Sequence, residues 1–508
     1  MIFYKSTRGE DKNLYSFSEA VLQGIAQDGG LLVPEEIPHV SSEQLKILIQ
    51  TSYQEKAIFV LKQFQTDLSE YTLKRIVDTA YANNYDNPSI VPIVHLKKNQ
   101  YILELWHGPT LAFKDMALQI MPLLFLEALK KSEENPLKYL ILVATSGDTG
   151  KAALEGYKDK DDIAIMVFYP HGHVSKLQEL QMITQDGENV AVYAMQGDFD
   201  AVQRTIKSIF NDRRFNQKLL DKYQIGLSSA NSINWGRLLP QIVYYMSSYI
   251  DLVDRKVIQW RNRIDVVVPT GNFGNILAGF YAKKMGLPIR KLICASNENN
   301  VLSDFFHTGV YDITHRTLIK TPSPSMDILI ASNIERLLFV ITNDAKKVSG
   351  WMKDLREKKK FIVDTKTKEL LQDEFYVDWI SNEECLVNIE KVFRDTNYLM
   401  DPHTSVAQAV AEKYLDSVGT ETPLVVCSTA HWSKFARDVY QALRPMKERM
   451  FVDEFDVLEE ILDLVPRISI PKAIKELKGK TIRHKGKCEA DKGEVKDIIV
   501  DCINFLYN

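Results

Sequence analysis

Short apolar runs rich in β-branched residues recur from about residue 138, and each is followed by a polar loop and a helical pattern. The four clearest runs are 139–145, 163–169, 264–270 and 424–430. Runs that are apolar throughout, rather than at alternate positions, are typical of strands covered on both faces. The pattern therefore predicts an α/β fold in which mostly parallel sheets lie between helices. Because ligands bind at the carboxyl ends of such strands, we expect the chemistry in the four loops that follow them.

The other segments are mainly helical in pattern. Residues 1 to about 95 place apolar residues three or four positions apart, as in 42–64, and end in the Asn/Asp/Pro-rich stretch 81–89. We expect an N-terminal helical domain there. The apolar run 116–126 has only 11 residues, whereas a membrane span needs about 20, so it predicts a buried helix. Beyond residue 440 the chain is rich in charge and predicts a peripheral helix or strand pair.

Length and charge narrow the class of protein. The 508 residues exceed what one core holds, and 45% hydrophobic with 26% charged residues is ordinary for a globular protein. A net charge of -4 creates no field that favours nucleic acid or anionic lipid, so we expect no nucleic acid and no membrane as partners. Five scattered cysteines without a C-x-x-C pair, and a charged N-terminus without an apolar signal core, favour the reducing cytoplasm.

The loop Gly271–Asn275 (GNFGN) is a candidate anion site. It follows an apolar run and begins a helical pattern, so its backbone N–H groups and the helix dipole would converge on a phosphate. The alternative is a tight turn that uses glycine only for its backbone freedom, and the loop alone favours neither reading. The G-x-G-x-x-G pattern of dinucleotide-binding proteins is absent.

A second loop, Thr145–Lys151 (TSGDTGK), lacks the first glycine of a P-loop and has Ala152 where a P-loop has Ser or Thr. Its hydroxyls and backbone donors suit a carboxylate or phosphate. The alternative is that Asp148 or Thr149 simply caps the following helix. Ser428–His431, after the last apolar run, is likewise either a ligand-binding loop or a cap, and the dispersed histidines predict no metal site.

Lys114 lies in an unusual setting for a lysine. Apolar residues precede and follow it, and Asp115 is the only charged neighbour in the sequence. Most lysines are solvated, but burial among apolar groups lowers the pKa of an amine and makes it available as a nucleophile and base. The pattern therefore predicts a lysine of the Schiff-base type, with Asp115 in a structural role.

Seven segments of the chain, in order, resemble the threonine synthase family. They are HGPTLAFKD (107–115), ATSGDTGKAA (144–153), SSANSINWGR (228–237), PTGNFGN (269–275), SPSMDI (323–328), MDPHT (400–404) and STAHWSKF (428–435). The resemblance implies a fold-type-II, tryptophan-synthase-β-like architecture, in which two α/β lobes enclose pyridoxal 5'-phosphate and a mainly helical N-terminal domain is added. The boundaries we expect are 1–95 for the N-terminal domain, 96–262 and 263–465 for the two parts of the catalytic core, and 466–508 for a peripheral C-terminal segment.

The resemblance also implies a role for individual residues. Lys114 would carry the cofactor as a Schiff base and act as the catalytic residue. The residues that would bind the cofactor with it are Gly271, Asn272, Phe273, Gly274 and Asn275 at its phosphate, Thr429 at its ring nitrogen, and Asp148. Those that would bind the substrate are Thr145, Ser146, Gly147, Asp148, Thr149, Ser232, Asn234 and Arg237. Arg237 suits a phosphate because its guanidinium group can make two parallel hydrogen bonds.

The activity implied is that of a carbon–oxygen lyase acting on phosphates, which converts O-phospho-L-homoserine and water to L-threonine and phosphate in threonine biosynthesis. Two alternatives stay open. One is a phospho-lyase that releases 2-oxobutyrate from the same substrate, and the other is a non-catalytic protein that binds a phosphate-bearing ligand. We expect no metal, a small-molecule substrate as the only partner, and either a monomer or a homodimer.

Overall fold

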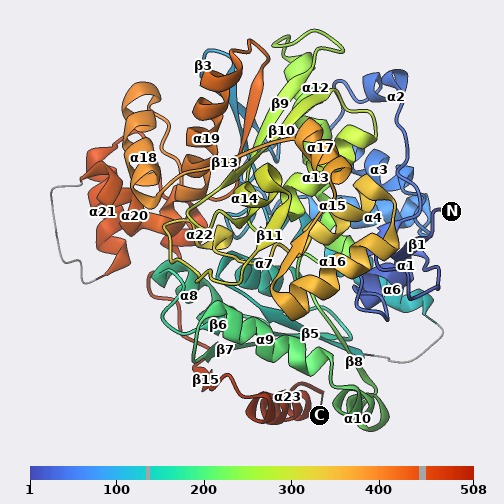
Figure 1. Cartoon of the computed structure of the whole chain (residues 1–508). Helices are drawn as coiled ribbons and strands as arrows, with labels where there is room; N and C mark the ends of the chain where they lie inside the picture. The colour runs from blue at the N-terminus through green and yellow to red at the C-terminus, as the bar shows by residue number, and fades with distance from the viewer. Residues whose placement is uncertain (133–137, 445–452, 508) are drawn as a thin grey trace.

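The computed structural model describes residues 1–132, 138–444 and 453–507, and it contains two separate main sheets (Figure 1). The larger sheet has the order β13-β10-β9-β14-β4-β3, and all its pairs are parallel except β3 with β4. Its strands are β3 (Ile93–Lys97), β4 (Gln100–Glu104), β9 (Ile264–Pro269), β10 (Ile289–Ser296), β13 (Phe375–Trp379) and β14 (Leu424–Ser428).

The smaller sheet has the order β15-β7-β6-β5-β8 and is parallel throughout. Its strands are β5 (Lys138–Ala144), β6 (Ile163–Pro170), β7 (Val190–Met195), β8 (Ile225–Ser228) and β15 (Gly486–Cys488). Two short antiparallel pairs complete the strands: β1 (Tyr4–Ser6) with β2 (Leu32–Pro34), and β11 (Val310–Asp312) with β12 (Lys360–Ile362). The four apolar runs correspond to β5, β6, β9 and β14, which confirms the prediction of parallel α/β sheets.

Helices cover both faces of the sheets (Figure 1). Those in the first half of the chain are α1 (Phe17–Gln23), α2 (Ser42–Lys46), α3 (Tyr53–Gln63), α4 (Glu70–Ala80), α5 (Asp115–Leu118), α6 (Met121–Lys131), α7 (Asp148–Tyr157), α8 (Lys176–Ile183), α9 (Phe199–Phe210), α10 (Arg213–Tyr223), α11 (Trp235–Leu238) and α12 (Gln241–Asp254). The later ones are α13 (Gly274–Lys284), α14 (Val301–Thr308), α15 (Ile334–Thr342), α16 (Ala345–Lys358), α17 (Thr365–Glu374), α18 (Asn382–Thr396), α19 (Pro402–Val418), α20 (Ala436–Leu443), α21 (Glu454–Leu464), α22 (Lys472–Lys475) and α23 (Lys492–Tyr507), with the 3-10 helices η1 (Pro324–Met326) and η2 (Trp432–Phe435). Among the described residues, no helix is long and apolar enough to span a bilayer.

The strand β5 shows why its sequence is apolar at every position. Leu140 and Leu142 pack into one core with α9 and α23, whereas Ile141 and Val143 point to the opposite face and into a second core. Both sets are fully buried. Neighbouring side chains of a strand point to opposite faces. In a strand that lies between two layers of helices, both faces are buried, so every position is apolar.

Two long helical patterns are interrupted in the structure. The segment 42–64, expected to be helical throughout, is split into α2 and α3, with Gln50 at φ 63° and Ser52 capping α3. The segment 116–126, expected to be one buried helix, is divided between α5 and α6. Pro122 explains the second break, since proline fits the first turn of a helix and disrupts its interior. The predicted burial is confirmed.

Each of the two main sheets is built from segments that are not consecutive in the sequence. Strands β3 and β4 precede β5 in the sequence, yet they pair beside β14 in the larger sheet. At the other end of the chain, β15 pairs with β7 and α23 packs on α9, so the C-terminal segment returns to the smaller sheet (Figure 1). Its strand therefore extends an existing sheet instead of forming a pair of its own. The domain boundaries given above stay a prediction.

Candidate functional site

The end of strand β14 holds the segment that carries Lys114. Phe113 N donates to Thr429 O at 2.9 Å, and His431 N donates to Leu111 O at 3.1 Å. These two bonds lay residues 111–113 along the carboxyl end of β14, at the edge where parallel strands place ligands. Lys114 and Thr429, 315 positions apart in the sequence, are thereby brought to one place.

The amine of Lys114 is buried beside two polar groups. The residue is 8% exposed, and Nζ lies 3.3 Å from Ser325 Oγ and 3.5 Å from Asp148 Oδ2. Burial lowers the pKa of this amine, with Asp148 opposing the shift and the cations Lys434 and Arg237 adding to it. Asp115, by contrast, is occupied by the backbone N–H and the hydroxyl of Thr110, at 2.8 and 2.6 Å. The prediction of a buried amine at position 114 with a structural Asp115 is consistent with this geometry.

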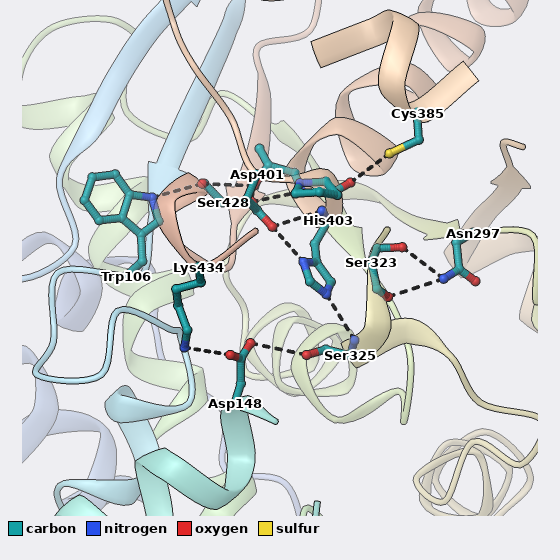
Figure 2. Close-up of polar contacts among 12 residues, drawn as sticks. Trp106, Asp148, Asn297, Ser323, Ser325, Cys385, Asp401, His403, Ser428 and Lys434 are labelled. Carbon is teal, nitrogen blue, oxygen red and sulfur yellow. Dashed lines mark hydrogen bonds and ion pairs between the residues drawn. The ribbon is translucent and has the colours of Figure 1, made fainter. Parts of the chain in front are cut away.

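Asp148, at the start of α7, is the carboxylate of the site (Figure 2). Its Oδ1 accepts from Lys434 Nζ at 2.6 Å and from Gln178 Nε2 at 2.7 Å, and its Oδ2 accepts from Ser325 Oγ at 3.2 Å. Burial alone raises the pKa of this carboxyl group, but the ammonium groups of Lys434 and Lys114 hold it well below its ordinary value. Asp148 is therefore ionised at neutral pH.

The loop before α7 is organised by Thr145. Its hydroxyl accepts from the backbone N–H groups of Gly147 and Gly150, at 3.0 and 2.8 Å, so neither Asp148 nor Thr149 caps the helix as the alternative interpretation held. Gly147 has φ 135°, and a Cβ there would lie 2.6 Å from the amide of Gln178. Ser146 and Thr149 are partly exposed. Their substrate-binding roles, and that of Thr145, stay predictions.

The turn η1 carries Ser325 to the same carboxylate, and a histidine fixes it (Figure 2). Ser325 N donates to His403 Nε2 at 3.1 Å, and His403 Nδ1 donates to Asp401 Oδ2 at 2.7 Å. Since Nε2 accepts a backbone N–H, the proton of the neutral ring is on Nδ1. His403 and Asp401 are 2% and 1% exposed. This relay orients Ser325 toward Lys114 and Asp148.

The glycine loop after β9 begins an uncapped helix. Phe273 has φ 61° and its ring packs against Phe306 and Phe375, and no side chain caps the N-terminus of α13. A Cβ on Gly271 would lie 2.6 Å from Ser325 O, so the loop and η1 are in close contact. An uncapped helix N-terminus favours an anion.

Asn275, in the first turn of α13, has a side-chain N–H group that is not hydrogen-bonded among the described residues. Its Oδ1 accepts from the hydroxyls of Tyr244 and Tyr245 at 2.5 and 2.6 Å, whereas its Nδ2 is buried without a partner among the described residues. Buried donors are nearly always hydrogen-bonded in native proteins. The orphaned Nδ2 therefore suits an acceptor oxygen, and with the uncapped helix it favours a phosphate site in this loop over a plain turn.

Arg237 is a buried cation without a carboxylate. It is 3% exposed, Nη1 donates to Ala230 O, and Nε has no partner among the described residues. Burial lowers the pKa of its guanidinium group to about 10. The hydroxyl of Tyr157, which interacts electrostatically with Arg237, is also buried and has no partner among the described residues. Two such donors, one of them charged, suit an anion.

Ser232 and Asn234 differ in what their side chains contact. Ser232 lies against the glycine loop, since a Cβ on Gly274 would be 3.6 Å from Ser232 Cβ. Asn234 is fully buried, with Oδ1 accepting from Gly236 N at 2.9 Å and Nδ2 donating to Val21 O at 2.8 Å. These contacts favour a positioning role for Asn234, because it caps the short helix that carries Arg237. Its role at the substrate stays a prediction.

The structure thus collects most of the predicted residues, and it adds four that were not singled out. Ser325, His403 and Lys434 lie within the segments SPSMDI, MDPHT and STAHWSKF, so the signal was present in the sequence. Gln178 lies in no such segment, and its contact with Asp148 is visible only in three dimensions. Among the described residues, no group of three His, Cys, Asp or Glu side chains is arranged to hold a metal ion.

Known proteins resemble this chain over most of its length. The family described as "Threonine synthase N terminus" matches residues 3–81, and "Threonine synthase, C-terminal" matches residues 404–499. Human threonine synthase-like 1 is 46% identical over 84% of this chain, which spans only 58% of the human protein. The threonine synthase of Schizosaccharomyces pombe is 37% identical over 94% of this chain and 98% of its own length.

Solved structures agree with these sequences. Threonine synthase from Brucella melitensis with bound PLP superimposes with a TM-score of 0.86 at 34% identity, over 100% of both chains. Yeast threonine synthase gives a TM-score of 0.86 at 34% identity, over 99% of both chains.

Proposed function

This chain belongs to the threonine synthase family, and we propose that it converts O-phospho-L-homoserine and water to L-threonine and phosphate with pyridoxal 5'-phosphate as its cofactor. One observation carries the proposal. A buried amine at Lys114 is bonded to Ser325, which touches the glycine loop before the uncapped N-terminus of α13, and it faces the buried guanidinium group of Arg237. Asn275 Nδ2 in that helix and Arg237 Nε have no partner among the described residues. Two anion sites around one reactive amine fit a phosphate-bearing cofactor and a phosphate-bearing substrate.

The residues present fit the cofactor. Lys114 would hold it covalently, the N-terminus of α13 and Asn275 Nδ2 would take its phosphate, and Thr429, whose backbone is bonded to the segment of Lys114, would supply a hydroxyl to its ring nitrogen. Bound pyridoxal phosphate supplies an electron sink for negative charge that develops at the carbon atoms next to the substrate amine. A threonine hydroxyl, unlike a carboxylate, does not enforce protonation of the ring nitrogen. The sink is therefore mild, which suits elimination and replacement.

Lys114 would act as the base that moves protons on the substrate. As a free amine within 3.5 Å of both Ser325 and Asp148, it removes the proton from the substrate Cα and returns protons at neighbouring positions. Ser325 Oγ accepts from Lys114 and donates to Asp148, which fixes the direction of the amine. Lys114 can serve as the base in several steps because a different residue, Arg237, binds the leaving phosphate.

Arg237 binds that leaving phosphate. Its guanidinium group is buried and has no anionic partner among the described residues, and the Tyr157 hydroxyl is a second donor without a partner there. Ser232, which lies against the glycine loop, would add a hydroxyl. Held by these donors, the departing phosphate stays near the carbon to which water is added.

Product analysis tests the proposal. The purified holoenzyme is incubated with O-phospho-L-homoserine, and inorganic phosphate, L-threonine and 2-oxobutyrate are quantified. We expect threonine and phosphate in equal amounts, and no product from Lys114→Ala. Phosphate with 2-oxobutyrate in place of threonine would make the protein a phospho-lyase, and a colourless protein without turnover would make it a binding protein.

A further inference from the structure

Lys434, on η2, is a fully buried cation whose role the reaction described above does not use. Its side chain is 0% exposed, and Nζ donates to Asp148 Oδ1 at 2.6 Å and to Thr110 O at 2.9 Å. A buried ammonium group is costly unless it is paired and hydrogen-bonded. Lys434 is therefore held in place by Asp148, and Asp148 by Lys434 (Figure 2).

The carboxylate of Asp148 is shared unequally by two lysines. Lys434 approaches Oδ1 to 2.6 Å, whereas Lys114 remains 3.5 Å from Oδ2. Gln178 and Ser325 supply two more hydrogen bonds to the same carboxylate. Its charge is thus compensated even when Lys114 is uncharged. Without Lys434, the nearest cation for Asp148 would be protonated Lys114, and a carboxylate beside an amine favours the ammonium form.

We propose that Lys434 is a positioning residue, the permanent counter-ion of Asp148, and that it thereby keeps Lys114 available as a free amine. The inference rests on the proposed role of Lys114. The charged groups that face Lys114 are Asp148 from α7, Lys434 from η2 and Arg237 from α11. A protonated Lys114 therefore faces two other cations and one carboxylate.

Among the residues that the structure describes, Asp148 is the ion-pair partner of Lys434. Asp115 and His431 are the other titratable groups near its ammonium group, and His403 faces Asp148. Asp115 is already bonded twice by Thr110. Lys434 therefore compensates the charge of Asp148.

The size of the effect follows from the geometry. Both ammonium nitrogens lie within 3.5 Å of oxygens of the same carboxylate, so they are within roughly 8 Å of each other. At an effective dielectric constant of about 20, two unit charges at that distance change each other's pKa by about 1.5 units. Removing the charge of Lys434 should raise the pKa of Lys114 by at least about one unit.

The test measures the protonation of Lys114 directly. Reductive ¹³C-methylation labels the lysines of the cofactor-free full-length chain, and the signal missing in Lys114→Ala identifies position 114 in an NMR pH titration. In Lys434→Met and Lys434→Gln we expect this signal to titrate at least about one pH unit higher than in the wild type. In Lys434→Arg it should titrate within a few tenths of the wild-type value, because the charge is kept.

Controls separate charge from damage to the fold. Lys358→Met removes an ammonium group that is 68% exposed and should leave the titration unchanged. In Asp148→Asn the Lys114 signal should titrate at lower pH than in the wild type. This variant tests the inference if neither neutral variant of Lys434 folds. An unchanged titration in folded Lys434 variants, or an unchanged or raised one in Asp148→Asn, would overturn the inference. Since no substrate is involved, this result is independent of the product analysis.

Discussion

Replacing Arg237 with methionine should make the ligand-free site more stable and the phosphate-bound site weaker. Arg237 is buried, its Nε has no acceptor, and no carboxylate among the described residues pairs with it. Without a bound anion, no carboxylate among the described residues compensates the charge of Arg237. A methionine of similar length removes that charge and keeps the packing of α11.

The two effects differ in size. An unsatisfied buried donor costs about 1–3 kcal/mol, and the variant also loses the bond to Ala230 O, so we expect a net gain of about 1–2 kcal/mol. With an unfolding entropy of about 2.1 cal/mol/K per residue, a chain of 508 residues shifts its Tm by about 1 °C per kcal/mol. Truncating one partner of a buried, hydrogen-bonded charge pair costs about 2–5 kcal/mol of binding, which raises KM or Kd roughly 30-fold or more.

Calorimetry of the holoenzyme with and without inorganic phosphate measures both. In the wild type, phosphate at about 100 times its Kd should add about 2.7 kcal/mol of stability, or between 2 and 3 °C in Tm. In Arg237→Met the Tm without phosphate should be about 1–2 °C higher than in the wild type, and phosphate should hardly change it. Arg394→Met, which alters a side chain 61% exposed, is the matched control.

A less stable Arg237→Met with an undiminished response to phosphate would refute this reasoning. Arg237 would then be a structural cation whose charge is compensated inside the protein. Unchanged steady-state kinetics with O-phospho-L-homoserine would also show that Arg237 does not hold the substrate phosphate.

Three further predictions concern other parts of the molecule. Lys114→Ala should lose the visible absorption of bound pyridoxal phosphate and keep its circular dichroism, and a persisting band would place the cofactor elsewhere. Gly271→Ala should lower cofactor affinity at least tenfold in a fluorescence titration, since its Cβ would lie 2.6 Å from Ser325 O; Gly350→Ala, with nothing within 4 Å, should instead stabilise α16 by about 0.5–1 kcal/mol. Burial alone lowers the pKa of His107, but its two carboxylate partners raise it to about 9, so its contribution of about 3 kcal/mol is complete below about pH 6.5 and lost as pH rises through about 9. His107→Gln should therefore flatten the urea stability profile between pH 7 and pH 10, and an unchanged slope would contradict this.

Local order was readable from the sequence because it depends on near neighbours. The apolar run at 139–145 predicted β5 because a strand buried on both faces leaves no polar position. The apolar flanks of Lys114 predicted its burial for a similar reason. Periodicity failed at 42–64 and 116–126, where it continued through breaks set by Gln50 and Pro122.

The residues that are bonded to Asp148 could not be predicted from local sequence patterns, because the tertiary fold brings them together. Asp148 is bonded to Gln178, Ser325 and Lys434, which lie 30, 177 and 286 positions further along the chain. No local pattern relates these residues, since they are carried by three separate helices, α8, η1 and η2.

The sequence by itself thus determined the kind of elements, the parallel α/β architecture, the family and the candidate amine. The tertiary structure alone decided that β3 and β4 join the larger sheet, that the C-terminal strand completes the smaller one, and which lysine neutralises Asp148. The reason is physical: hydrophobic periodicity and capping act over a few residues, whereas a buried charge is stabilised by whichever opposite charge the packing of distant segments places against it.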